Sequence, residues 1–192
     1  MSADDTGGEA ARPQRRLRAD AQRNEDRLLK AAAVAFAREG AGASVKDIAR
    51  AAGVGVGTLY RRFPSKELLV EATYRHEVEQ LCQAAPELAA AEPPAEALRA
   101  WMRRFVEFMA TKRGMADALR LVLTDDGERL ETRVHLTDAV ALLLDRGPTR
   151  PGVEAHDVLM MLGGISLMAE SERETGLAEK LIDLLLHGVL PE

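Results

Sequence analysis

The sequence predicts an all-α protein with a small helix-turn-helix domain at its N-terminus and a larger helical domain after it. Three observations support this fold class. Ala and Leu dominate a chain of 192 residues in which aromatic residues make up only 4%, a composition that favours helices over sheets. Apolar residues recur at the helical spacing of three and four positions, and no stretch alternates convincingly at period two. Gly and Pro residues divide this pattern into about nine helical segments.

Composition excludes several other classes of protein. The single cysteine cannot form an internal disulfide or a four-cysteine zinc site. The longest apolar runs are far shorter than a bilayer span, and the first thirty residues contain no apolar core of a signal peptide. We therefore expect a cytoplasmic protein with no membrane partner.

The net charge of −5 hides a strong asymmetry along the chain. Residues 1–10 carry a charge of −3, whereas residues 11–66 contain 13 Lys or Arg and 5 Asp or Glu. Residues 67–192 contain 13 Lys or Arg and 23 Asp or Glu. A basic region suits phosphate because binding releases the counterions condensed on nucleic acid. A solvated surface of mixed charge is the alternative interpretation.

Helix-capping residues and helix-breaking residues predict the bounds of the N-terminal segments. Residues 1–19 are polar and lack an apolar period, so we expect a disordered arm that is basic in its second half. A helix should run from Asp20 to Gly40, because glycine readily adopts the left-handed conformation that ends a helix. A second helix should begin at Ser44, which has the spacing of a capping box with Asp47.

Glycine and proline also delimit the segments that follow. Gly53 should end the second helix, and a short third helix from about Gly57 to Phe63 should bury Leu59 and Phe63. A fourth helix should begin at Ser65 and reach about Cys82, followed by a Pro/Ala-rich joint over residues 84–94. Five more helices are expected. The first begins beyond Pro94 and ends at about Gly114, and the other four span about 115–123, 128–145, 154–171 and 176–190.

Residues 44–66 have the spacing of a helix-turn-helix. Both helices are too short to form a core alone, and the small Ala49 and Ala52 allow them to cross closely. No acidic residue occurs from Ile48 to Lys66, although an ordinary solvated helix would include acids. The outward surface of the third helix is therefore polar and basic.

Three stretches of this region form a recognisable pattern. They are Ser44-Val45-Lys46-Asp47-Ile48-Ala49, then Gly53-Val54, and Gly57-Thr58-Leu59-Tyr60-Arg61-Arg62-Phe63-Pro64-Ser65-Lys66-Glu67-Leu68-Leu69. With them, residues 20–80 resemble the N-terminal domain of TetR-family transcriptional regulators. The resemblance implies a DNA-binding domain over 20–66 and a helical domain over 67–192 that binds a ligand and forms a dimer.

The resemblance also implies DNA contacts, residue by residue. Arg61 would read guanine, because its guanidinium matches the O6 and N7 acceptors. Thr58 would contact a phosphate or a base edge, Tyr60 would donate its phenol hydroxyl to a phosphate, and Arg62 would clamp a phosphate. Lys66 would add its charge to the free amides at the start of the fourth helix. The expected DNA-binding residues are Ser44, Lys46, Val56, Gly57, Thr58, Tyr60, Arg61, Arg62 and Lys66.

The chain departs from the family pattern at two positions. Gly55 stands where the family often has a residue with a hydroxyl or amide side chain, so the third helix lacks that side-chain cap. Val56 replaces a polar residue and suggests an apolar contact to a thymine methyl group.

The second domain is expected to bind an unidentified small-molecule effector and a second copy of the chain. Broad apolar coverage of the last two helices indicates a partner surface, and the resemblance implies a two-fold dimer. The expected ligand-binding residues are Trp101, Phe105, Phe108, Met109, His135 and Met161. The expected dimer residues are Leu159, Leu162, Gly163, Ile165, Leu181, Leu184 and Leu185.

No pattern in the sequence indicates an enzyme. Residues 53–57 alternate Gly and Val, but they follow a helix, whereas a dinucleotide loop follows a strand. Glu131, His135 and Asp138 share a helical face, although such a triplet is more often solvated than metal-binding. No Gly-x-Ser-x-Gly frame surrounds Ser166. We therefore expect no catalytic residue, metal or cofactor.

These observations together predict a ligand-responsive transcriptional regulator. We expect a repressor that binds a palindromic operator in double-stranded DNA as a homodimer and leaves it when a small molecule binds. Two alternatives stay open: a helical small-molecule-binding protein, or an activator whose DNA binding requires the ligand.

Overall fold

The structure is a computed structural model that describes residues 11–123, 126–171 and 176–191. Within these ranges the chain forms nine α-helices and one short 3-10 helix and contains no strand, so the predicted all-α class is confirmed. No helix among them is long and apolar enough to cross a membrane. The helices are α1 (Ala11–Glu39), η1 (Gly40–Gly42), α2 (Val45–Ala52), α3 (Val56–Arg62), α4 (Lys66–Ala91), α5 (Pro94–Gly114), α6 (Ala116–Val122), α7 (Asp126–Leu144), α8 (Ala155–Ser171) and α9 (Leu177–Val189).

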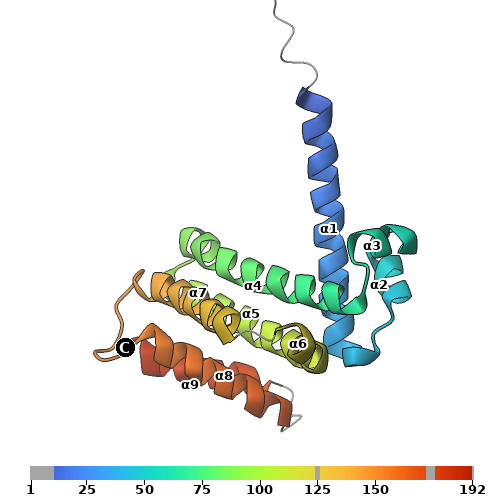
Figure 1. Ribbon diagram of the computed structural model, residues 1–192. Coiled ribbons are helices and arrows are strands. Elements are labelled where there is room, and N and C mark those ends of the chain that lie inside the picture. Colours follow the sequence, from blue (N-terminus) through green and yellow to red (C-terminus); the bar gives the residue numbers. More distant parts are fainter. Residues whose placement is uncertain (1–10, 124–125, 172–175, 192) are drawn as a thin grey trace, which may run out of the picture.

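The helices form a small N-terminal unit and a layered larger one (Figure 1). Helices α2 and α3 lie beside the second half of α1, and α4 leads from them into the rest of the molecule. There α4 packs on α5 and α7, and α8 and α9 form an outer layer against α5 and α7. Helix α5 is central because it contacts α1, α4, α7, α8 and α9.

Helix α1 begins earlier than the sequence predicts. The expectation of a disordered arm is wrong for residues 11–19, which are helical, whereas residues 1–10 lie outside the described residues. Pro13 falls in the first turn, where a proline is tolerated, and no Gly or Pro follows it until Gly40. Among the side chains of α1 that the structure describes, from Asp20 onwards, the first buried apolar one is Leu28, and Figure 1 shows the start of the helix extending beyond the other helices.

Helix α4 also continues past its predicted end. The expected joint over 84–94 is wrong, because α4 runs unbroken to Ala91 with Pro86 inside it. Pro86 lacks the amide that would bond the carbonyl of Cys82, four residues earlier. The flanking residues Ala84, Ala85, Leu88 and Ala89 are all buried, and their burial offsets this loss.

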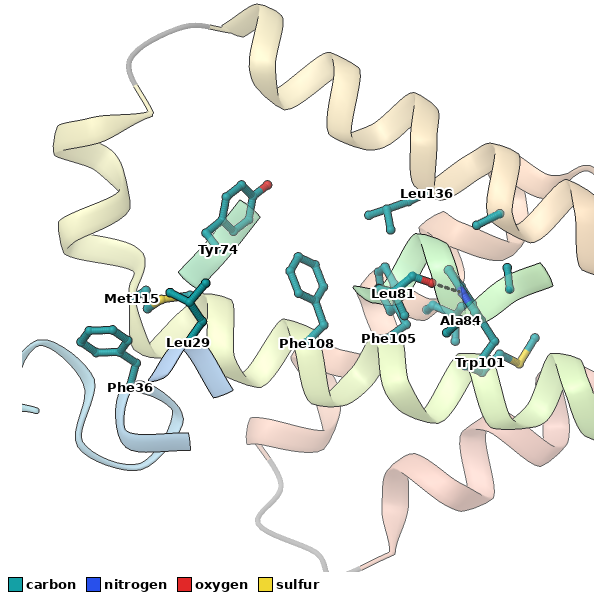
Figure 2. Close-up of a cluster of buried hydrophobic side chains, with 14 of the residues drawn as sticks. Leu29, Phe36, Tyr74, Leu81, Ala84, Trp101, Phe105, Phe108, Met115 and Leu136 are labelled. Atoms are coloured by element: carbon teal, nitrogen blue, oxygen red, sulfur yellow. Dashed lines mark hydrogen bonds between the residues drawn. The ribbon is translucent and has the colours of Figure 1, made fainter. Parts of the chain in front are cut away.

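The core is organised along α5. Trp101 is fully buried, and its indole Nε1 donates a hydrogen bond of 2.9 Å to the carbonyl oxygen of Leu81 (Figure 2). The rings of Trp101 and Phe105 lie 5.8 Å apart between centroids, and Phe108 continues the row towards Tyr74 of α4. This row joins α4 to α5 over most of their shared length.

The outer layer corrects part of the predicted dimer surface. Leu159, Leu162 and Ile165 are buried in the core of their own chain, so these side chains are not available to a partner. The sequence shows that α8 is apolar on more than one face, but it does not show which face the chain's own core covers. The large apolar side chains left exposed on α8 and α9 are Met160, Met161, Leu167, Met168 and Leu184.

The two units meet where the C-terminal ends of α5 and α1 cross. A Cβ atom at Gly114, the last residue of α5, would lie 2.0 Å from the carbonyl oxygen of Phe36 in α1. Gly40, which has a positive φ of 59°, faces the same contact, because its Cβ would lie 3.3 Å from the carbonyl oxygen of Gly114. Only a residue without a side chain allows the two backbones to approach this closely.

This contact predicts the effect of the substitution Gly114→Ala. The added methyl group must push α1 away from α5, and overpacking of this kind costs about 1–3 kcal/mol of unfolding free energy. Chemical denaturation followed by circular dichroism measures the loss. Gly188→Ala is the matched control, because a Cβ there meets no atom within 4 Å and the residue lies in a helix. Equal stability of the two variants would contradict the close contact.

Candidate nucleic-acid interface and ligand cavity

Helix α2 has the two ends that the sequence predicts. The Ser44 hydroxyl accepts a hydrogen bond of 3.4 Å from the backbone amide of Asp47. The other half of the predicted capping box is replaced, because the Asp47 carboxylate pairs with the Arg50 guanidinium. Gly53 ends the helix with a φ of 69°, a left-handed conformation that only glycine adopts at little cost.

Helix α3 is buried on its inner side and exposed on its outer side. Leu59 is buried, as is Phe63 just after the helix, whereas Thr58, Tyr60 and Arg61 are exposed. Gly55 begins the helix without a side-chain cap, as expected from its lack of a side chain. A Cβ at Gly57 would meet no atom of the chain within 4 Å. Nothing within the protein therefore requires glycine there, which fits a close approach from outside.

Arg62 has a partner within the protein. Its guanidinium forms a bidentate ion pair with Glu25 of α1, with Nη2 at 2.8 Å from Oε1 and at 3.0 Å from Oε2. The Glu25 carboxylate is largely covered, whereas the Arg62 side chain is 63% exposed. The structure thus places Arg62 as a brace between α3 and α1, whereas the sequence suggested a phosphate clamp.

Lys66 is likewise engaged inside the domain. Its Nζ donates a hydrogen bond of 2.7 Å to the carbonyl oxygen of Ala43 and lies 5.9 Å from the centre of the Phe36 ring. These contacts tie the first turn of α4 to the segment before α2 and to α1. Lys66 therefore lies between three elements of the protein, and its contact with a phosphate stays a prediction.

The basic groups that remain outward lie on both short helices. Lys46 and Arg50 are exposed on α2, and Arg61 is exposed on α3. Arg50 was not among the expected DNA contacts, and its signal was its place in the last turn of α2, within the acid-free stretch. Ser44 and Val56 are half-buried at the starts of the two helices. Helices α2 and α3 thus present a basic and hydroxyl-bearing surface that suits a phosphate backbone.

A cavity lies in the larger unit, between α4, α5, α6, α7 and α8. It consists of two adjoining hollows of about 220 Å³ and about 320 Å³, which share Tyr74, Met109, Lys112 and Arg129 in their walls. Phe105 and Phe108 line the first hollow, and Figure 2 shows both rings leaving α5 on the side of Leu136 in α7. A larger hollow of about 550 Å³ lies outside this cavity, between α1, α4 and α5, and is lined by both acids and bases.

The predicted ligand-binding residues divide into two groups. Phe105, Phe108 and Met109 line the cavity. The other three are not in its described lining: Trp101 is enclosed in the core, and His135 and Met161 are exposed on α7 and α8. The sequence missed the polar part of the lining, which includes Lys112, Arg129 and Arg133, because charged residues on a helix are usually solvated.

Two further groups considered in the sequence have structural explanations. Burial raises the pKa of the Cys82 thiol, and the nearby Asp138 and Glu79 raise it further, so the reactive thiolate is disfavoured. Among the described residues no three His, Cys, Asp or Glu side chains gather as a metal site would require, and this includes the triplet of Glu131, His135 and Asp138.

The brace between α1 and α3 can be tested by a double-mutant cycle. Glu25→Gln and Arg62→Gln should each lower the free energy of unfolding, and the double variant should lose less than the sum of the two. We expect a coupling free energy of about 0.5–1 kcal/mol for this partly covered bidentate pair. Strictly additive losses in chemical denaturation would mean that the two side chains do not act together.

Comparison with known families gives two matches that together span most of the chain. The model for bacterial regulatory proteins of the tetR family matches residues 28–73, which include α2 and α3. The model for the C-terminal domain of SbtR-like transcriptional regulators matches residues 93–191, which is more than half of the chain.

Known proteins extend this similarity to the whole fold. A crystal structure of a TetR transcriptional regulator from Streptomyces coelicolor is 44% identical, covers 87% of this chain and 98% of its own, and superposes with a TM-score of 0.80. A TetR transcription regulatory protein from Mycobacterium vanbaalenii is 33% identical, covers 91% and 99%, and gives a TM-score of 0.69. A curated HTH-type transcriptional regulator from Staphylococcus aureus is 42% identical over 71 residues, which span 35% of this chain and only 37% of that protein.

Proposed function

Because the chain belongs to the TetR family of bacterial transcriptional regulators, we propose that it is a repressor that binds a palindromic operator as a homodimer and is released by a small molecule. Membership makes it a DNA-binding regulator and not an enzyme. The observation that carries the finer proposal is that an exposed, basic reading surface on α2 and α3 and a cavity in the larger unit are linked through α1, which packs on both α4 and α5. We assign residues 20–66 to the reading domain and residues 67–192 to the regulatory domain.

The reading surface is proposed to enter the major groove through α3. Arg61 would contact guanine, and Thr58 and Tyr60 would contact phosphates or base edges, since all three are exposed on one short helix. Ser44, Lys46 and Val56 would contribute at its margins, and Gly57 would let the DNA strand approach the backbone. Arg62 and Lys66 would act through their internal contacts by holding α3 and α4 in place.

The dimer is proposed to form through the exposed apolar face of α8 and α9. This face comprises Met160, Met161, Leu167, Met168 and Leu184. Leu184 is the most exposed of these side chains, at 68%. Among the residues that the sequence suggested, Gly163, Leu181 and Leu185 are half-buried at its edge, so they can still contribute. Exposed large apolar side chains gathered on two neighbouring helices are typical of a protein interface.

Release is proposed to begin in the cavity. The cavity lies against α4 at Tyr74, and it lies against the last turns of α5 at Met109 and Lys112. Gly114, which contacts α1, follows Lys112 by two positions. A ligand that favours a different position of this end of α5 would move α1 and the attached reading helices, and the population would shift away from the DNA-binding state.

Sequencing of the DNA that the protein captures tests the proposed function. Purified protein is mixed with sheared genomic DNA of the source organism without ligand, and the bound fragments are sequenced. A palindromic site should be enriched. Enrichment only after a metabolite extract is added would favour the alternative, a regulator whose DNA binding requires its ligand. No enrichment in either condition would overturn the reading-surface assignment.

The variant Arg61→Ala distinguishes recognition of a base from general electrostatic attraction to DNA. We expect a loss of about 1–3 kcal/mol of binding free energy on the captured operator and a relaxed preference at one base position. Fluorescence anisotropy with operator variants measures both effects. Arg146→Ala is the control, because Arg146 is exposed beyond the C-terminal end of α7 and should not change affinity. An unchanged base preference in Arg61→Ala would remove Arg61 as the reader.

Leu184→Asp tests the dimer surface. A charge in the middle of an apolar interface should convert the dimer into a monomer, because the carboxylate would be buried without a partner. Light scattering after size-exclusion chromatography measures the mass. Leu121→Asp is the matched control, since Leu121 is also exposed but lies on α6. A Leu184→Asp protein that is still dimeric would place the interface elsewhere.

A further inference from the structure

We propose that the effector is a carboxylate with a compact apolar body, and that Lys112 holds its carboxylate group. This inference rests on the ligand-responsive role proposed above and specifies the chemistry of the molecule that fills the cavity. It follows from the charges in the cavity wall, from the surroundings of Lys112 and from the shape of the apolar lining.

The cavity wall combines cations with apolar groups. Lys112, Arg129 and Arg133 line the first hollow, and Arg113 and Arg120 join Lys112 and Arg129 in the second. Among the described residues that line either hollow, none is acidic. The larger hollow next to α1 differs, because Glu77, Glu87 and Glu107 balance its bases. The described lining of this cavity is therefore cationic and apolar, although Arg120 pairs with Asp117 on its own helix.

Lys112 is the cation whose surroundings most favour an anion. Its side chain is half-buried in α5, and its Nζ lies 5.7 Å from the centre of the Tyr74 ring. Burial lowers the pKa of Lys112, and the neighbouring Arg129 and Arg133 lower it further. The ammonium group is thus half-buried and lies near two like charges. A carboxylate bound there would reverse both effects, since it supplies an opposite charge and strong hydrogen-bond acceptors.

Arg129 and Arg133 stand one helical turn apart on α7 and flank the proposed carboxylate site. The guanidinium of Arg129 donates a hydrogen bond of 3.2 Å to the carbonyl oxygen of Leu123, which fixes it at the end of α6. Arg133 is also exposed, lines the first hollow and would meet the ligand at its rim. We therefore assign the direct contact to Lys112 and the long-range attraction to the two arginines.

The rest of the lining selects an apolar body. Phe105 and Phe108 stand with ring centroids 6.2 Å apart, and Leu136, Leu159 and Met109 complete the wall of the first hollow. Such a wall accepts an aromatic ring or a short acyl chain. A cationic ligand would be repelled by the lysine and arginines, and a neutral one would leave the Lys112 charge unpaired.

Matched pairs of carboxylates and amides test this inference. We would titrate the full chain with 2-naphthoate and 2-naphthamide, and with octanoate and octanamide, by isothermal titration calorimetry. The two members of each pair share the apolar body, and the head group is a charged carboxylate in one and a neutral amide in the other. At least one carboxylate should bind roughly tenfold or more tightly than its amide, as expected for a hydrogen-bonded charge. Lys112→Met, which keeps the apolar stem, should remove this preference.

Lys30→Met is the matched control, because Lys30 lines the separate hollow next to α1 and its loss should leave the preference unchanged. Arg133→Gln is a second variant, which should weaken carboxylate binding if Lys112→Met fails to fold. Amides that bind as tightly as carboxylates, or no carboxylate binding in either pair, would overturn the inference.

The same protein is tested for capture of genomic DNA, which separates this inference from the proposed function. If the protein captures DNA normally and a neutral amide releases that DNA, only the proposed anionic chemistry of the effector is overturned. Failure of DNA capture would overturn the regulator that the inference presupposes.

Discussion

The close approach of α5 to α1 at Gly114 is the constraint on which the arrangement of this protein depends. The two backbones meet where a single methyl group would lie 2.0 Å from the Phe36 carbonyl oxygen, so the contact has little freedom to adjust. Helix α1 in turn carries α2 and α3, since Leu28, Leu29 and Phe36 share one core with Ile48 and Leu59. The direction in which α3 points is therefore set by the contact of α1 with α5 as well as by its own turn.

Two polar contacts reinforce this arrangement, and both involve residues of the reading domain. The ion pair of Arg62 with Glu25 fastens α3 to α1, and the bond from Lys66 to the Ala43 carbonyl fastens α4 to the segment before α2. These contacts turn the helices from α1 to the start of α4 into one body. A displacement at the end of α5, where Lys112 faces the cavity, would then reach the reading surface without being absorbed by a flexible joint.

Local features of the fold could be predicted from the sequence, whereas features that depend on distant residues could not. Ser44, Gly53 and Ser65 act within three residues of the helix ends that they define, so their signals are visible in the sequence. The predicted break near Pro86 was wrong, because only packing against α5 and α7 keeps that part of α4 helical. Arg62 and Glu25 are 37 positions apart, and no local pattern marks such a pair. Leu162 was assigned to the dimer for the same reason, since periodicity identifies an apolar helix but not the neighbour that covers each face.

The distance between the two reading helices of the proposed dimer tests the central claim most directly. Spin labels are attached to Thr58→Cys in a Cys82→Ser chain, and the distance distribution is measured by pulsed electron resonance with and without Gly114→Ala. The account predicts a narrow distribution at about 34–36 Å, one turn of DNA, in the chain with Gly114. It also predicts a shifted or broadened distribution in the alanine variant, whose helices are intact. The same distribution in both chains would contradict the claim that the contact between α5 and α1 sets the position of the reading helices.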